Sequence, residues 1–395
     1  MSKKIDYSLL SYEEKREYKR RKRARQRLIA LIEIYTVFAV ILAVIILVVV
    51  FAVRHHRAKQ REEAVAYVVS MNGGEIAGEA DDGEDTDDSK DDGKSEDKEF
   101  SEEGEPDPSE SEEEDSDSGF AGGAENLTLI ETQNTASITG NVVSEHALLI
   151  DMSNGTVVAK KGSNARMYPA SMTKVLTILV AAENMTEADL DKVVPMTIEC
   201  TDYAYVNDCS AAGYEVGEQV TVRDLMYGTI LPSGGDAAAQ LAVYVAGSRE
   251  AFVDMMNERL EKMGISGTTH FTNMVGIYDD NHYSTCEDMA KIMYAAMQND
   301  ICRPVLECHI YTSSSTAEHP DGIELSNLFL RRIEDRDFGG TILGAKTGFV
   351  NQSGNCAVSC EKSDSGKYYL CVTTNSSSSW QCIRDHVEIY KNYGK

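Results

Sequence analysis

The chain has 395 residues and a formal net charge of −27, which is distributed very unevenly. Acidic residues concentrate between Glu75 and Glu125, whereas basic residues crowd into residues 1–27, directly before an apolar run. The basic cluster therefore belongs to a membrane-topology signal and leaves no basic face for nucleic acid, which we exclude as a partner. From about residue 142 onward the composition is that of a globular domain, and ~250 residues suffice to bury a large core.

The apolar run predicts one transmembrane helix over residues 28–53. From Ile34 to Val53 the chain carries no charge, and about 20 such residues cross ~30 Å of hydrocarbon. A cleaved signal peptide is the alternative, but its apolar region should span only ~7 to 15 residues and end in a small-residue cleavage site. The basic excess on the N-terminal side predicts that residues 1–27 are cytoplasmic. We therefore expect a single-pass cell-membrane protein whose C-terminal part is extracellular.

The composition of residues 54–140 predicts a disordered acidic linker. The stretch is rich in Asp, Glu, Ser and Gly, with few branched or aromatic residues after about Val69. Such a segment buries too little apolar surface to offset the entropy lost on ordering. A cation-binding acidic tract is the alternative, although blocks of like charge are usually solvated chain. We interpret the stretch as a spacer in front of a domain over residues 141–395.

The domain over residues 141–395 predicts an α+β fold. A β-hairpin is expected from His146 to Ala159, turning at Asn154 and Gly155. Helical patterns follow, and Thr221 and Thr285 each stand three residues before an Asp, as in a capping box. Later elements are predicted as strands at 341–347, 355–360 and 368–373 and a helix at 380–393. Strands at both ends with helices between them indicate that the two terminal segments share one antiparallel sheet.

All nine cysteines follow the apolar run, where an extracellular location would permit disulfides. Cys360 and Cys371 could face each other across a hairpin that turns near Gly366. A zinc site has less support, because Cys356 and Cys360 lack a second paired-ligand motif with suitable His. We therefore predict no metal site.

Ser171 and Lys174 form the first of three short blocks that together predict an acyl-transfer site. A serine hydroxyl needs an adjacent base, and a helical run after Pro169 would put Lys174 one turn from Ser171 on the same face. Lysine can act as that base only when burial or neighbouring cations lower its pKa. The apolar residues that follow Lys174 favour burial. Alone, the pair is a weak signal.

The second and third blocks are Ser233-Gly234-Gly235 and Lys346-Thr347-Gly348. Taken alone, Ser233 is more typical of a helix N-cap, whereas beside a nucleophile it can relay a proton to the leaving amine. The third block follows an apolar strand, where an ammonium and a hydroxyl would bind a substrate carboxylate. A glycine at its third position keeps side-chain bulk away. The joint occurrence of the blocks in this order is far more specific than any one of them.

The three blocks resemble those of serine-type D-alanyl-D-alanine carboxypeptidases, which are low-molecular-weight penicillin-binding proteins. The resemblance covers nearly the whole domain and is supported by further stretches at 169–174, 217–226, 271–277 and 281–290. It implies a β-lactamase/transpeptidase-like fold, in which a five-stranded antiparallel sheet packs against a mostly helical lobe. The site would lie at their junction.

The resemblance also implies residue roles and a reaction. Ser171 would be the acylated nucleophile, Lys174 its general base and Ser233 the proton relay. The enzyme would remove the terminal D-Ala from peptidoglycan stem peptides through an acyl-enzyme, without metal or organic cofactor. β-Lactams such as penicillin would be covalent inhibitors.

The same resemblance implies that the third block binds the substrate. Lys346 and Thr347 would anchor the terminal carboxylate beside Gly348, and the backbone N–H groups of Ser171 and Phe349 would form the oxyanion hole.

Two departures from the family pattern stand out. Gly235 occupies a position where the family usually has Asn, so an amide contact is missing, and we expect a water or Asp236 to take its space. The tether is expected at the N-terminus rather than in a C-terminal amphipathic anchor.

Two other functions remain open. A class A β-lactamase needs a Glu for the deacylating water, and no Glu-x-x-Leu-Asn stretch follows Gly235. A catalytically silent wall-binding or β-lactam-sensing receptor is supported by Gly235 and the transmembrane segment, because fold resemblance alone does not establish activity.

Overall fold

The computed structural model of the chain describes residues 127–395. The predicted cytoplasmic segment (1–27), transmembrane helix (28–53) and most of the acidic linker (54–140) therefore lie outside the described residues. Within residues 127–395, no helix combines the length and the apolar character that a membrane span requires.

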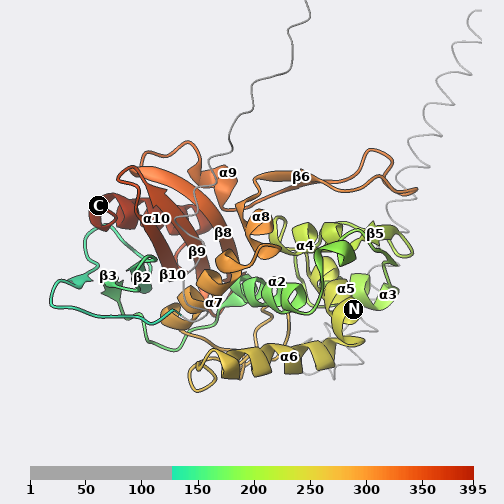
Figure 1. Cartoon of the computed structure of the whole chain (residues 1–395), viewed down its shortest axis with the longest axis horizontal. Helices are drawn as coiled ribbons and strands as arrows, with labels where there is room; N and C mark the ends of the chain where they lie inside the picture. Colours follow the sequence, from blue (N-terminus) through green and yellow to red (C-terminus); the bar gives the residue numbers. More distant parts are fainter. Residues whose placement is uncertain (1–126) are drawn as a thin grey trace, which may run out of the picture. The chain divides into compact units, whose positions relative to one another are not determined.

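Strands from both ends of the domain form one sheet, as the sequence predicts. Its order is β1-β3-β2-β10-β9-β8, and β2 pairs antiparallel with β10, which joins the N-terminal hairpin to the three C-terminal strands (Figure 1). The five long strands are β2 (His146–Asp151), β3 (Val157–Lys161), β8 (Gly340–Val350), β9 (Gly354–Ser363) and β10 (Tyr368–Ser376). Each predicted strand range falls within one of them.

The sheet has six strands rather than the expected five, because β1 (Ala136–Ser137) adds parallel to β3. The Ile138 N–H donates to the Lys160 carbonyl at 2.9 Å, and the Ile138 side chain is buried in the core. Residues 136–138 thus pack with the domain that we expected over residues 141–395. The physical reason is composition: residues 127–138 carry apolar side chains such as Leu127, Leu129 and Ile138, which the acidic tract lacks.

The two faces of the sheet are covered by different helices. Leu148, Cys360 and Leu370 pack with α7 (Cys286–Gln298) on one face. Residues that alternate with them pack on the other face with α9 (Leu330–Ile333) and α10 (Ser379–Tyr393). This alternation follows the two-residue period of a strand.

The same alternation rules out a disulfide between Cys360 and Cys371, a possibility that the sequence had left open. In the register of β9 and β10, Cys360 lies opposite Leu370 and Cys371 lies opposite Ser359. Neighbouring positions on a strand point to opposite faces, so the two thiols belong to different cores. The sequence indicates where the hairpin turns but not the register of its strands, and the register decides which face each thiol occupies.

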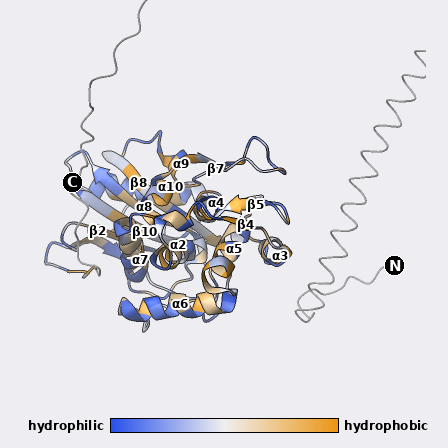
Figure 2. Cartoon of the chain, turned by 45° about the vertical axis from the view of Figure 1, so that its right-hand side comes forward, coloured by the Kyte–Doolittle hydropathy of each residue, from blue (hydrophilic) through white to orange (hydrophobic). Residues whose placement is uncertain are grey.

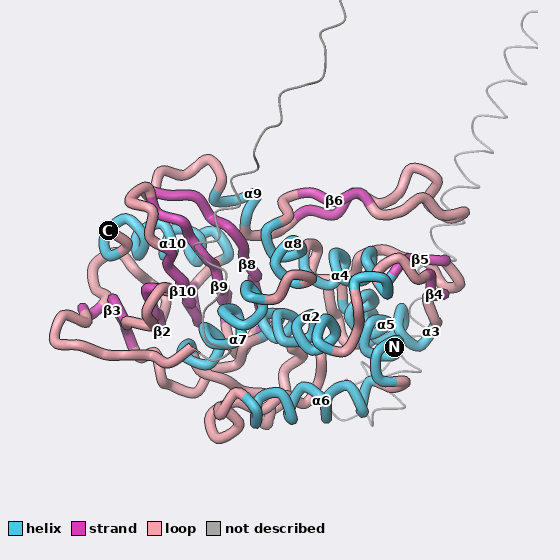
Figure 3. Tube along the Cα trace, viewed as in Figure 1, coloured by secondary structure: helices cyan, strands magenta, loops and turns pink. Residues whose placement is uncertain are grey.

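The helical lobe lies beside the sheet (Figure 3). At its centre is α2 (Lys174–Glu183), whose residues from Lys174 to Ala182 are all buried. The outer helix α6 (Arg249–Lys262) buries only Phe252, Met256 and Leu260, which recur every fourth residue, and Figure 2 shows hydrophilic residues between them. The remaining helices of the lobe are α3 (Ile198–Val206), α4 (Val222–Ile230), α5 (Gly235–Ala246) and α8 (Cys302–Glu307).

Two predicted helix starts are confirmed. Thr221 caps α4 and Thr285 caps α7, each accepting a backbone N–H from the residue three positions on at 3.0 Å. The short strands pair two by two: β4 (Val193–Pro195) with β5 (Gln219–Thr221), and β6 (Ile310–Thr312) with β7 (Glu324–Ser326).

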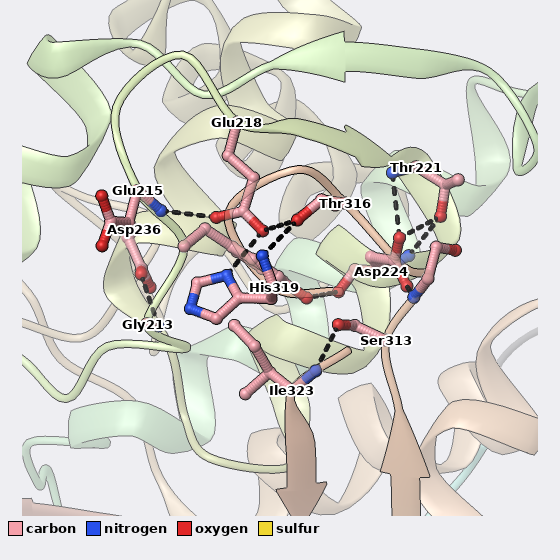
Figure 4. A network of polar contacts seen from close by, with 12 residues as sticks. Gly213, Glu215, Glu218, Thr221, Asp224, Asp236, Ser313, Thr316, His319 and Ile323 are labelled. Carbon is pink, nitrogen blue, oxygen red and sulfur yellow. Dashed lines mark hydrogen bonds and ion pairs between the residues drawn. The ribbon is translucent and has the colours of Figure 1, made fainter. Parts of the chain in front are cut away.

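Hydrogen bonds to two buried carboxylates, Glu218 and Asp224, connect the β6–β7 hairpin to the helical lobe (Figure 4). Glu218 accepts a hydrogen bond from the Thr316 hydroxyl at 2.8 Å, and His319 Nδ1 lies 2.8 Å from the same oxygen. Asp224 accepts a hydrogen bond from the Tyr311 hydroxyl at 2.8 Å. Because a buried carboxylate is costly unless it is hydrogen-bonded, these contacts stabilise one position of the hairpin.

Candidate active site

The first block lies where the sheet meets the helical lobe. Ser171 lies on a 3₁₀ turn, η2 (Ala170–Thr173), and Lys174 is the first residue of α2, so the expected helical run starts later than Ser171. In a 3₁₀ turn residues i and i+3 eclipse each other, which brings the two side chains together. Lys174 Nζ donates to Ser171 Oγ at 3.0 Å.

Lys174 is held in a buried position. Its side chain is 1% exposed, and Nζ also donates to the Val275 carbonyl at 2.8 Å. Burial lowers the pKa of Lys174 to about 8, although Cys209 and Asp236 act in the opposite direction. An amine with this pKa is partly neutral near physiological pH, so it can accept the proton of the Ser171 hydroxyl.

The Val275 carbonyl is positioned by a loop to which the sequence analysis assigned no role. Asn273 Oδ1 accepts backbone N–H groups from Val275, Gly276 and Ile277 at 2.8 to 3.2 Å. Gly276 has a φ of +85° and packs so closely on Ala170 that a side chain there would overlap its carbonyl. The signal in the sequence was Asn273 followed by a glycine three residues later, a pattern typical of a turn.

His282 forms a hydrogen bond with the turn that carries Ser171, and the sequence analysis assigned it no role either. Its Nδ1 accepts the Thr272 N–H at 3.1 Å, so Nε2 carries the proton and donates to Thr173 Oγ1 at 2.8 Å. Burial lowers the pKa of His282 to about 3, so the ring is neutral. It stacks on Phe271 with ring centroids 4.7 Å apart.

The second and third blocks meet at a hydrogen bond. Lys346 Nζ, on β8, donates to Ser233 Oγ at 2.9 Å and to the Thr347 carbonyl at 2.9 Å. Gly234, rather than Ser233, is the N-cap of α5, so the helix-cap interpretation of Ser233 is wrong. Burial, with Lys174 nearby, holds the pKa of Lys346 well below its usual range.

Gly348 allows β8 to lie against the nucleophile turn. A Cβ at this position would lie 3.0 Å from the Ser171 backbone nitrogen and 2.9 Å from the Pro169 carbonyl oxygen. The glycine therefore keeps side-chain bulk away from the Ser171 turn itself.

These residues open onto a cleft of about 540 Å³. Ser171, Ser233, Thr347 and Gly348 line it, and Phe349 stands at its edge with 58% of its surface exposed. Residues 207–210 form another wall of the cleft. Lys346 is buried and does not itself line the cleft, whereas Ser233, to which its amine donates, does.

Asp236, which follows the second block, binds the chain just after the wall over residues 207–210. The Asp236 carboxylate accepts backbone N–H groups from Ala212 at 2.8 Å and Gly213 at 3.1 Å (Figure 4). It therefore stabilises the segment that continues from the wall.

Comparison with known proteins identifies the family. The family model described as D-alanyl-D-alanine carboxypeptidase, Peptidase S11, matches residues 131–377, well over half of the chain. The chain belongs to the peptidase S11 family.

Individual members of the S11 family are similar to this chain. DacF, a D-alanyl-D-alanine carboxypeptidase of Bacillus subtilis, is 35% identical over 150 residues, which is 37% of this chain and 37% of DacF. The D-alanyl-D-alanine carboxypeptidase of Streptomyces sp. strain K15 is 33% identical over 199 residues, which is 48% of this chain and 67% of that protein. The match thus spans little more than a third of DacF.

Solved structures are similar in fold to this S11 family member. The crystal structure of the Streptomyces K15 DD-transpeptidase is 26% identical and superposes with a TM-score of 0.58, covering 64% of this chain and 98% of that one. The α+β domain therefore has the transpeptidase-like fold that the resemblance implied.

Gly235 stands where Asn is usual in the S11 family. The space that a side chain would need there is occupied by Cys209, which we did not expect. A Cβ at this position would lie 2.8 Å from the Cys209 Cβ and 3.3 Å from the Ala204 Cβ. Asp236, which we expected to fill this space, instead binds the backbone of residues 212 and 213.

We predict that Gly235→Asn lowers the thermal unfolding temperature and does not raise kcat/KM in an assay for D-Ala release. Overpacking a tight site costs about 1–3 kcal/mol, and kcat/KM should change by no more than about a hundredfold. Adding Cys209→Gly, which removes the colliding Cβ, should restore part of the lost stability. An unchanged unfolding temperature with a raised kcat/KM would contradict this packing argument.

Proposed function

We propose that this S11 family member is a serine-type D-alanyl-D-alanine carboxypeptidase that removes the terminal D-Ala from peptidoglycan stem peptides. The observation that carries the proposal is the 3.0 Å contact between Ser171 Oγ and a buried Lys174 whose pKa is lowered to about 8. This is an activated nucleophile paired with its base.

In the proposed acylation, Ser171 Oγ attacks the carbonyl carbon of the penultimate D-Ala while Lys174 accepts the hydroxyl proton. The backbone N–H groups of Ser171 and Phe349 would stabilise the oxyanion. When the C–N bond breaks, the Ser233 hydroxyl gives its proton to the departing amine and takes up the proton that Lys174 accepted from Ser171, so that Ser233 and Lys174 both return to their starting states. Lys346 Nζ donates a hydrogen bond to Ser233 Oγ and so holds the relay in place. Water then hydrolyses the ester and frees Ser171.

Thr347 presents a side chain to the same cleft and is proposed to bind the substrate carboxylate. Penicillin would acylate Ser171 by the same route, because its strained amide takes the place of the scissile bond.

The function is tested by incubating the full-length protein with a D-Ala-D-Ala pentapeptide and with fluorescent penicillin. We expect D-Ala release and a covalently labelled protein. Labelling without D-Ala release would favour a silent receptor, and rapid turnover of penicillin would favour a β-lactamase.

We also propose that residues 28–53 anchor the protein in the cell membrane, with residues 1–27 cytoplasmic and the catalytic domain outside. The basic cluster before Leu28 and the charge-free run to Val53 support this topology. External protease on intact cells should cut the acidic linker and release an active fragment. Complete protection of the domain would show the opposite orientation.

A further inference from the structure

The catalytic cleft has few charged side chains among the described residues that line it. Among the described residues that line it, Arg332 is the only cationic side chain and Asp208 the only acidic one. A peptide that ends in D-Ala-D-Ala carries its carboxylate one residue beyond the bond to be cut. A carboxylate taken out of water into such a cleft needs a cationic or hydrogen-bonding partner.

The ammonium of Lys346 is not placed to be that partner on its own. It is 1% exposed and already donates to Ser233 Oγ and to the Thr347 carbonyl. A second cation that faces the cleft would satisfy the carboxylate without breaking the contact to Ser233.

Arg332 comes from a segment outside the three blocks, yet the structure ties that segment to the third block. Asn327 Nδ2 donates to the carbonyl of Ala345, the residue before Lys346, at 3.2 Å. Asn327 Oδ1 accepts the backbone N–H groups of Phe329 at 3.0 Å and Leu330 at 3.2 Å, which starts α9. Consequently α9 lies beside β8 (Figure 1).

The Arg332 guanidinium is pre-oriented by protein contacts. Its Nη1 donates to the Leu328 carbonyl at 2.8 Å, and its Cζ lies 5.8 Å from the ring centroid of Trp380. A guanidinium has five N–H donors in a planar fork, so donors remain for a ligand. That fork matches the two oxygens of a carboxylate.

We propose that Arg332 binds the C-terminal carboxylate of the substrate, together with the Thr347 hydroxyl, and so makes the enzyme selective for peptides with a free C-terminus. The inference rests on the proposed carboxypeptidase function and adds a specificity-determining residue to it.

The test compares Arg332→Gln and Arg332→Lys in the full-length protein on two substrates: the D-Ala-D-Ala pentapeptide and the same peptide with a C-terminal amide. Arg332→Gln should lower kcat/KM for the free acid about 10- to 100-fold, mainly by raising KM, since hydrogen bonds to charged groups have this strength. The amide should be affected much less. Arg332→Lys should keep part of the activity, because the charge remains and the fork is lost.

Arg336→Gln is the matched control. The Arg336 Cζ lies 5.9 Å from the same Trp380 ring, but this residue lines a different pocket, beside Arg384 and Glu388. It should leave kcat/KM for both peptides unchanged. If the amide is turned over too slowly to measure, its competition with fluorescent penicillin labelling gives the same comparison of affinities.

Three results would overturn the assignment of Arg332: unchanged kcat/KM for the acid in Arg332→Gln, equal losses for acid and amide, or the same loss in Arg336→Gln. Thermal unfolding of each variant separates a folding defect from lost recognition. Absence of D-Ala release by the natural protein would instead contradict the proposed function.

Discussion

Ser171→Ala should abolish both covalent labelling by penicillin and release of D-Ala. The substitution removes only Oγ, the atom that lies 3.0 Å from Lys174 Nζ and forms the ester in the proposed mechanism. Without that atom no acyl-enzyme can form, and a water in its place lacks the fixed geometry of a bound nucleophile. Labelling is measured by fluorescence of the denatured protein on a gel, and D-Ala by its enzymatic oxidation.

The fold should survive this change, because Cβ and the backbone of the turn remain. Ser153→Ala, at the exposed turn of the β2–β3 hairpin, is the control for a serine hydroxyl lost elsewhere. Full-rate labelling of the Ser171→Ala protein would show that another residue is acylated, and the site assignment would then be wrong.

Lys174→Ala should slow acylation by at least about a thousandfold, within the range of positioned general-base catalysis. The amine is the group that accepts the Ser171 proton, and it also bonds the Val275 carbonyl. Because alanine leaves a cavity, Lys174→Met is the better matched variant: it keeps the length of the buried chain without a basic atom. Stopped-flow acylation by fluorescent penicillin measures both. Acylation at near-natural rates in Lys174→Met would show that another group is the base.

The pH dependence of acylation gives an independent check on Lys174. Its pKa is lowered to about 8 by burial, and only the neutral amine can accept a proton. The acylation rate should therefore rise with pH through about 8 and level off above it. His282 would give a different profile, because burial lowers its pKa to about 3 and it stays neutral throughout this range. A rate that is flat from pH 6 to 10 would contradict the assignment of Lys174.

The sequence by itself determined the features that depend on residues close together in the chain: helix starts, strands and the Ser171–Lys174 pair. Thr221 and Thr285 were identified as helix starts because the capping contact spans only three residues. The C-terminal strands followed from alternation along the chain, and the Ser171–Lys174 pair followed from i, i+3 spacing, although its turn is 3₁₀. The three blocks also predicted that their residues share one site, because they carry a known combination of chemical groups, but they did not predict the hydrogen bonds between the blocks.

Contacts between distant segments were decided only by the tertiary structure. The Lys346–Ser233 bond joins residues 113 positions apart, and the Val275 carbonyl that holds Lys174 lies 101 positions away from it. Sheet register placed Cys360 and Cys371 in different cores, and pairing of residues 136–137 with β3 added a sixth strand. The close approach of the Cys209 side chain to Gly235 is also a contact between segments that are separated in the sequence. Local propensity carries no information about such contacts, because they depend on how whole elements pack, and the burial that lowers the pKa of Lys174 exists only after they have packed.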